Sequence, residues 1–495
     1  MSGAGGIAAQ PARALDVETI ARYTVWIILA YFVAQLAIRL GLSGNLETDE
    51  AQFVGQTDFA FGYGNSHPPV YNWLVGGALY LTGSWPAAVA LIKNAFLAGT
   101  YLLVYDTGRR ISGRHLTGLL AAASLLFLPQ VVWKSQITLA HSVMVMFGVA
   151  ATLHAAMLIR ERGRTGDFLW LGVAACAGAF AKYNYFIALA AILLAAWSVR
   201  ELRDRLFVPR LAWSAGLFAL LYMPHLVWVA ANLSEATQRV AKLERMHPLF
   251  SLVDLPVLGI DGLLAMGVAA LAWAGPLVTV WFLVWRLTPA DGPRAGPDAG
   301  REIAARFFAR VTLFGLGILG AAVLAADFHD VHERYLTPLL ISVPLWLAAA
   351  WPLELRGRAP VHFLRVAGVL VLAMLTAWPG WILFGKEQFA YPYRAFAADI
   401  RAETRVPIAV LAERDKIGAN IAIRLDGARM WSPGEEPGRV LLVWEGHSDG
   451  APGGMADELG EAYAPAGAVV KLTAPYDNFS GETARLSYQV FQRRP

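Results

Sequence analysis

The chain is short of charged residues and has almost no cysteine. Charged side chains make up 16% of its 495 residues, whereas hydrophobic residues make up 57%. Soluble domains carry about 25% charged residues, so a single soluble domain is excluded, as are a disordered chain and a collagen-like fibre. The lone cysteine, Cys176, lies in an apolar run and excludes a disulfide framework within the chain. The composition that remains is that of a polytopic membrane protein.

A strong excess of one charge is also lacking, since 41 basic residues stand against 37 acidic ones. This balance does not favour a nucleic-acid partner. The basic residues are mostly arginines in short loops between apolar runs, which is typical of the cytoplasmic loops of membrane proteins. With all five clusters in the cytoplasm, the predicted helices alternate consistently. The clusters run from Arg109 to Arg114, Arg160 to Arg164, Arg200 to Arg210, Arg294 to Arg310 and Arg356 to Arg365.

The apolar runs are long enough for membrane helices, which need about 20 residues each. The first, 24–42, follows an Ala/Gly-rich segment, 1–23, without a signal-peptide cleavage pattern, so we expect a cytoplasmic tail and a retained anchor. Run 168–199 is too long for one span and is interrupted at Lys182-Tyr183-Asn184, which predicts two short helices. Segment 70–84 is either re-entrant or half of another pair. The other runs lie near 86–106, 115–131, 139–159, 211–231, 262–285, 307–326, 335–352 and 365–384.

The composition changes after Lys386, where charged residues, glycine and proline return. Short β-like runs appear at 407–411, 440–444, 469–472 and 486–491, with a helical stretch at 415–424. We therefore predict an all-α membrane domain, 24–385, with about 11 to 13 spanning helices. A small α/β domain, 386–495, follows it, and its size is usual for a domain. In a bacterium this second domain and the first outer loop, 43–85, lie in the periplasm.

Charged side chains at membrane depth are costly, so they become functional candidates by default. In the first outer loop, Asp49 and Glu50 form an acidic pair, and His67 precedes two prolines. A solvated helix cap is the alternative for the acidic pair. Lys134 follows the third span and Lys182 lies in the break at 182–184; their alternative is snorkelling to the interface.

The outer loop 327–335 adds His332 and Arg334, for which a plain surface loop is the alternative. Carboxylates such as those of the acidic pair can accept a proton or hold a divalent metal. Lysine, arginine and histidine side chains can neutralise a phosphate. Such a combination at one membrane face suits deprotonation of an acceptor hydroxyl while the cations stabilise a lipid-phosphate leaving group.

These residues resemble the first periplasmic loop of bacterial family 39-like glycosyltransferases, which are GT-C-fold enzymes. Their relatives include protein O-mannosyltransferases and the lipid A aminoarabinose and galacturonic acid transferases. The resemblance covers about 20–385. Its motifs are Asp49-Glu50-Ala51, Gly62-Tyr63, His67-Pro68-Pro69 with Trp73, Lys93-Asn94, Ala181-Lys182-Tyr183, Pro224-His225-Leu226-Val227-Trp228 with Asn232, and Arg334-Tyr335 with Pro338.

The resemblance implies transfer of a sugar from a polyprenyl-phosphate-linked donor, by inverting single displacement, at the periplasmic face of the inner membrane. It implies that Asp49 is the catalytic base or orients the acceptor, and that Glu50 supports Asp49 or a metal. The donor phosphate would contact Lys182, Arg334 and His67, with His332, Lys134 and Tyr183 as further candidates. The acceptor would be lipid A, a polysaccharide, a glycolipid or a protein of the envelope, and no nucleic acid is expected as a partner.

One departure concerns metal binding. Many relatives carry a second acidic residue after the third span, and His141 occupies that position here. Either a divalent metal is held by Asp49, Glu50 and His141, or this branch needs no metal, or His141 packs between helices.

Two other classes of function explain the sequence less fully. A carrier or flippase for a lipid-linked sugar would show inverted repeats and polar groups near the bilayer midplane, whereas the polar residues here gather at one face. A structural scaffold would explain the C-terminal domain but not the acidic loop. A membrane glycosyltransferase explains both.

Overall fold

The computed structural model describes residues 16–63, 67–236, 260–289, 298–326, 328, 331–386, 388–404 and 408–494. Most of the predicted tail 1–23 therefore lies outside the described residues, as do most of loop 232–261 and Asp327, His329 and Asp330 of the outer loop 327–335. From the tail, the structure describes the short helix α1 (Val17–Arg22), whose N-terminus is capped by the Asp16 carboxylate.

Seven helices in the described residues are long and apolar enough to cross a membrane. Three further pairs of helices pass the same test together but bend between their halves, which raises the number to as many as ten. Adding the shorter apolar helix α9 (Thr165–Ala179) gives the eleven expected from the sequence. The seven are α2 (Thr24–Leu42), α5 (Trp85–Ser112), α8 (Ala140–Glu161), α12 (Leu211–Ala231), α14 (Ile260–Leu287), α15 (Ala299–Ala325) and α18 (Ala359–Phe384).

The bent pairs have identifiable breaks. Pro129 separates the α6 (His115–Ser124) and η1 (Leu125–Phe127) half from the π-helical turn η2 (Gln130–Lys134) and α7 (Ser135–Ile137), and the halves are inclined by 78°. Proline has no N–H to continue the helical ladder. The other pairs are α10 (Tyr185–Ser198) with α11 (Arg200–Leu206), bent by 109°, and α16 (Glu333–Leu340) with α17 (Val343–Ala350) and η3 (Leu353–Leu355), bent by 45°.

The break predicted at Lys182-Tyr183-Asn184 is confirmed. Helix α9 ends at Ala179 and α10 begins at Tyr185. Glycines allow the close packing around this turn, because a Cβ on Gly148 of α8 would lie 2.4 Å from the Gly178 Cα, and a Cβ on Gly178 would lie 2.2 Å from the Tyr185 ring. Small residues of this kind let membrane helices approach closely. The crossing fixes the 182–184 turn against the start of α8.

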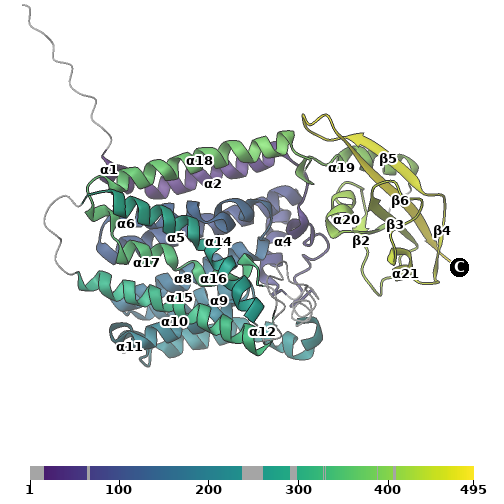
Figure 1. Cartoon of the computed structure of the whole chain (residues 1–495). Helices are drawn as coiled ribbons and strands as arrows, with labels where there is room; N and C mark the ends of the chain where they lie inside the picture. The colour runs from purple at the N-terminus through teal and green to yellow at the C-terminus, as the bar shows by residue number, and fades with distance from the viewer. Residues whose placement is uncertain are drawn as a thin grey trace, which may run out of the picture.

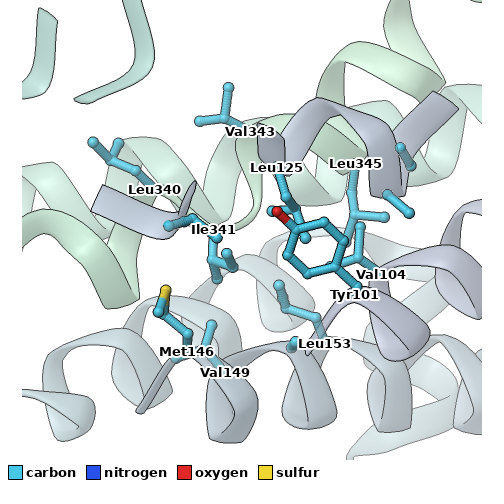
Figure 2. Close-up of a cluster of buried hydrophobic side chains, with 14 of the residues drawn as sticks. Tyr101, Val104, Leu125, Met146, Val149, Leu153, Leu340, Ile341, Val343 and Leu345 are labelled. Carbon is cyan, nitrogen blue, oxygen red and sulfur yellow. The ribbon is translucent and has the colours of Figure 1, made fainter. Parts of the chain in front are cut away.

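The membrane part has one continuous apolar core that draws on nearly all of its helices. Figure 2 shows a section where α5, α8, η1 and the α16–α17 bend face one another, so the broken helices end inside the core. The side chains labelled there are Tyr101, Val104, Leu125, Met146, Val149, Leu153, Leu340, Ile341, Val343 and Leu345.

The predicted strands after 386 are confirmed, although the sheet is larger than expected. Its order is β2-β1-β3-β6-β4, with β5 also paired to β6, and only the β1–β2 and β1–β3 pairs are parallel. Alternate residues of β1 and β3 face α19 and α20 on one side and α21 on the other. The elements are β1 (Ala409–Ala412), β2 (Arg429–Met430), β3 (Arg439–Glu445), β4 (Tyr463–Pro465), β5 (Val470–Pro475), β6 (Thr483–Arg493), η4 (Gln388–Ala390), α19 (Tyr393–Glu403), α20 (Asp415–Ala422) and α21 (Met455–Leu459).

The sheet lies at one end of the helical bundle, beyond the end of α18 (Figure 1). Helix α18 runs beside α2, and the chain after each helix reaches this end. The short helices α3 (Thr48–Ala51) and α4 (Val70–Thr82) lie here as well. The first outer loop therefore lies between the membrane helices and the C-terminal sheet.

Candidate active site

One cavity brings together most of the candidates from the sequence. Its volume is about 280 Å³, and its lining includes both apolar and charged side chains. The polar side chains among its lining are Asp49, Gln52, His67, His141, Ser142, Lys182, Tyr183, Asn184, Arg334 and Tyr335. The lining is contributed by the first outer loop, the start of α8, the α9–α10 turn, the end of α15 and the start of α16.

Asp49 lies on the short helix α3, which is held in shape by a capping box. The Glu47 side chain accepts from the Thr48 N–H, and the Glu50 carboxylate accepts from the Glu47 N–H. The Asp49 Oδ2 accepts a hydrogen bond of 2.7 Å from the backbone N–H of Leu139. The second oxygen, Oδ1, forms no hydrogen bond within the described part of the chain, so it is available to a hydroxyl group in the cavity.

Leu139 has an unusual backbone conformation. Its φ is +64°, in the left-handed region that non-glycine residues rarely adopt, and it directly precedes α8. Such conformations cost about 1–3 kcal/mol and persist where the surrounding structure fixes them. The strained turn aims the Leu139 N–H at Asp49 and starts α8 so that His141 and Ser142 reach the cavity.

Glu50 does not line the cavity, although it is next to Asp49 in sequence. Successive helical residues point about 100° apart, so the two carboxylates diverge. The Glu50 side chain is 1% exposed and lies 2.9 Å from both the Arg39 guanidinium and the Lys93 ammonium. Burial alone would raise the pKa of Glu50, but Lys93 and Arg39 outweigh it and hold that pKa below its ordinary value. This geometry makes Glu50 the centre of a buried ion cluster, not a group aimed at substrate.

Lys182 and Ser142 meet across the cavity wall. The Lys182 Nζ donates to the Ser142 Oγ over 3.0 Å. This contact joins the α9–α10 turn to the first turn of α8 and holds the ammonium at the cavity. Ser142 was not singled out from the sequence, although it follows His141 directly.

His67 and His141 form a stacked pair in the wall of the cavity. Their ring centroids are 4.1 Å apart with an interplanar angle of 27°. The His141 ring also lies 5.2 Å from the Tyr71 ring and 5.5 Å from the Phe53 ring. His141 therefore packs against aromatic rings, as one of the alternatives from the sequence expected, and it also lines the cavity.

Tyr183 connects the cavity to α12 and the outer loop. Its hydroxyl lies 3.2 Å from the Nε2 of His225, whose Nδ1 lies 2.8 Å from the Phe61 carbonyl oxygen. Arg334 lies at the first turn of α16, with its guanidinium 5.3 Å from the Tyr335 ring centroid. Both Tyr183 and Arg334 line the cavity.

Two phosphate-binding candidates lie elsewhere. Lys134 ends the π-helical turn η2 and is exposed, and His332 precedes α16 with its ring 6.1 Å from Tyr335. Neither is among the residues that line the cavity. Of the expected metal ligands, Asp49 and His141 line the cavity, but Glu50 is turned away. No three His, Cys, Asp or Glu side chains in the described ranges are placed to hold a metal ion. The described side chains of this site therefore do not fit a resident metal.

The chain is similar to known proteins in sequence and in fold. A family model described as dolichyl-phosphate-mannose-protein mannosyltransferase matches residues 66–228. The chain is also 29% identical over 467 residues to RgtB of Rhizobium johnstonii, a lipopolysaccharide core galacturonosyltransferase, covering 89% of this chain and 92% of RgtB. RgtA of the same organism, with the same description, is 27% identical over 485 residues, covering 92% of this chain and 95% of RgtA.

Among solved structures, ArnT from Cupriavidus metallidurans shares the fold. The crystal structure bound to undecaprenyl phosphate matches with a TM-score of 0.54 at 13% identity, over 94% of this chain and 98% of ArnT. The apo structure matches with a TM-score of 0.55 at 12% identity and the same coverage. At these identities the likeness concerns the fold, and the sequence relatives supply the class of enzyme.

The chain is a membrane glycosyltransferase of the GT-C type. The resemblance read from the sequence is thus confirmed, and transferases among the relatives favour this interpretation over a lipid-sugar carrier. The matched segment 66–228 includes His67, His141, Lys182 and Tyr183.

Proposed function

We propose that this glycosyltransferase moves a galacturonic-acid-type sugar from a polyprenyl-phosphate carrier to a lipopolysaccharide-core-type acceptor at the periplasmic face. The proposed sugar and acceptor are those in the descriptions of RgtB and RgtA, and the similarity of both proteins to nearly the whole chain supports them. The carrier follows from the ArnT structure with undecaprenyl phosphate, which shares the fold.

The observation that carries the proposal is the pairing of one carboxylate with two cationic side chains in one cavity. Asp49 lines this cavity, and its Oδ1 accepts no hydrogen bond within the described part of the chain. Lys182 and Arg334 line the same cavity. A base and a phosphate site in a common cavity are what direct displacement needs, because the acceptor and the leaving group lie on opposite sides of one anomeric carbon.

The reaction is a single displacement. Asp49 takes the proton of the acceptor hydroxyl as the hydroxyl oxygen attacks the anomeric carbon of the donor sugar. The bond from that carbon to the phosphate oxygen breaks, and its electron pair leaves with the polyprenyl phosphate. The donor phosphodiester carries one negative charge and the leaving monoester gains a second, so Lys182 and Arg334 stabilise the charge that develops.

The apolar part of the cavity lining suits the carrier lipid. This part includes Leu319, Ala322 and Val323 from the end of α15, and Phe328 and Val331 beyond it. An isoprenoid chain against these side chains would leave its phosphate at Lys182 and Arg334.

The test is donor turnover by the purified protein in detergent. Polyprenyl-phosphate-linked galacturonate, aminoarabinose, mannose and glucose are each supplied with lipopolysaccharide core or with lipid A alone, and released polyprenyl phosphate is measured with the mass of the acceptor. We expect turnover with galacturonate and core, lost in Asp49→Asn and retained in Asp58→Asn, which changes an exposed aspartate of the same loop. Turnover with another sugar only, or an active Asp49→Asn, contradicts the proposal.

The side of the membrane is tested separately by labelling in intact cells. In a Cys176→Ala background, a membrane-impermeant maleimide should label Asp58→Cys without lysis, and Asp204→Cys, on α11, only after lysis. The reverse pattern would place the active site in the cytoplasm.

A further inference from the structure

The C-terminal domain contacts the loop that carries Asp49 through one asparagine. Asn420 of α20 is fully buried, and its side-chain amide pairs with the backbone of Leu46 in both directions. The Oδ1 accepts from the Leu46 N–H over 2.9 Å, and the Nδ2 donates to the Leu46 carbonyl oxygen over 2.8 Å. Two bonds to both polar groups of one residue fix the position and the rotation of that part of the loop.

Arg424 reinforces this pairing one turn further along. Its guanidinium donates to the Gly44 carbonyl oxygen over 2.7 Å and to the Asn45 Oδ1 over 2.6 Å. The Asn45 Nδ2 in turn donates to the Tyr391 carbonyl oxygen over 2.7 Å. The segment before the acidic pair is therefore bound to the C-terminal domain, nearly 400 residues away in sequence, by backbone and side-chain contacts.

The fixed segment leads directly into the catalytic helix. Leu46 is followed by the capping box that begins α3, and Asp49 lies in that helix. Ala419, beside Asn420, packs against Leu46 and Ala51, which flank Asp49 on both sides. Because α3 has only four residues, a shift of Leu46 is transmitted to the Asp49 carboxylate.

We propose that Asn420 is a positioning residue for catalysis: through Leu46 it holds α3 so that Asp49 points into the cavity. The C-terminal domain is then part of the catalytic apparatus and not only a cover. The proposal rests on the proposed role of Asp49 as base. The alternative is that Asn420 only holds the two domains together.

The chain offers a matched control for that alternative. Asn478 also joins the C-terminal domain to the membrane part with two side-chain hydrogen bonds, to the carbonyl oxygens of Ile382 over 3.0 Å and Gly385 over 2.6 Å. Those acceptors lie at the end of α18 and not in the acidic loop. Asn420→Ala and Asn478→Ala therefore each remove two side-chain hydrogen bonds between the domains. Only Asn420→Ala releases the backbone of Leu46.

Turnover of the full-length variants gives the first readout. We expect Asn420→Ala to lower kcat by about 10- to 100-fold, since displacement of a catalytic group by about 1 Å costs that much, while the donor KM stays within about twofold. Asn478→Ala should keep the wild-type kcat. Asn420→Asp retains an acceptor for the Leu46 N–H and should recover part of kcat. Equal kcat in the two alanine variants, or an equal loss in Asn420→Asp and Asn420→Ala, would overturn the proposal.

Hydrogen–deuterium exchange gives a readout that does not need turnover. Amides of residues 46–52 should exchange faster in Asn420→Ala than in wild type and Asn478→Ala, with the rest of the chain unchanged. If no donor is turned over by the wild type, or Asp49→Asn is active, the proposed function fails, and the exchange result still decides whether Asn420 orders α3. Unchanged exchange at 46–52 would refute the positioning role itself.

Discussion

Replacing Glu50 with glutamine removes a carboxylate that contacts two buried cations. Its oxygens lie 2.9 Å from Arg39 and 2.9 Å from Lys93, and all three side chains are at most 3% exposed. A glutamine of the same shape has one oxygen and one NH₂ group, so at least one cation would face a donor. Breaking a buried ion pair from one side costs about 3–5 kcal/mol, because an uncompensated charge is left without water.

The assay is thermal unfolding in one detergent, with Glu482→Gln as the matched control. Glu482 lies 2.8 Å from Lys386, but both side chains are at least half exposed, and such surface pairs contribute about 0–1 kcal/mol. We expect the melting temperature of Glu50→Gln to lie several degrees below that of wild type. The melting temperature of Glu482→Gln should equal that of wild type. Adding Lys93→Met to Glu50→Gln removes one orphaned cation and should recover part of the loss.

Two results would refute this reasoning. If Glu50→Gln melts with wild type, the buried cluster does not stabilise the loop. If the folded fraction of Glu50→Gln is as inactive as Asp49→Asn, Glu50 takes part in the reaction, as first expected from the sequence.

Three further predictions follow from the geometry. Burial raises the pKa of Glu50, but Lys93 and Arg39 outweigh burial and hold that pKa below its ordinary value. The stabilisation from this carboxylate is therefore complete at neutral pH and is lost as the pH falls through the lowered pKa. The difference in melting temperature between wild type and Glu50→Gln should narrow in acid, and a constant difference contradicts this. Lys182→Met should weaken donor binding by about 10- to 100-fold while Lys182→Arg retains it, because a charge-assisted phosphate contact is worth about 1.5–3 kcal/mol. Equal donor titrations of the two variants would exclude the contact. A Cβ on Gly62 would lie 2.2 Å from the Trp228 ring, so Gly62→Ala should displace the outer loop and make it more sensitive to protease. Gly77→Ala should not, because a Cβ on Gly77 would meet no atom within 4 Å. Equal cleavage of the two variants would show that the contact between Gly62 and Trp228 does not hold the loop.

The sequence predicted what local patterns determine. The apolar runs and the arginine clusters marked the spans, and the interruption at Lys182 marked the turn that lines the cavity. The strands after 386 were found because alternating apolar residues face two sides of a sheet. Asp49, His67, Lys182 and Arg334 were singled out because charge near membrane depth is costly, and the structure places all four in the lining of one cavity.

The features that the sequence did not predict depend on the direction of side chains and on contacts between residues far apart in the chain. Adjacency suggested that Asp49 and Glu50 act together, but one helical step turns Glu50 toward Arg39 and Lys93. Lys134 has the right charge but stands on a π-helical turn away from the cavity. Nothing in the sequence pairs Leu46 with Asn420, because their contact forms only when the sheet packs on the outer loop.

The measurement that tests the account most directly is the turnover of galacturonate donor by wild type and Asp49→Asn, with donor binding measured on the same samples. A general base contributes about 10²- to 10⁴-fold, so kcat should fall by at least about 100-fold while donor affinity is retained. An Asp49→Asn variant that keeps its kcat would show that the carboxylate in this cavity is not the base.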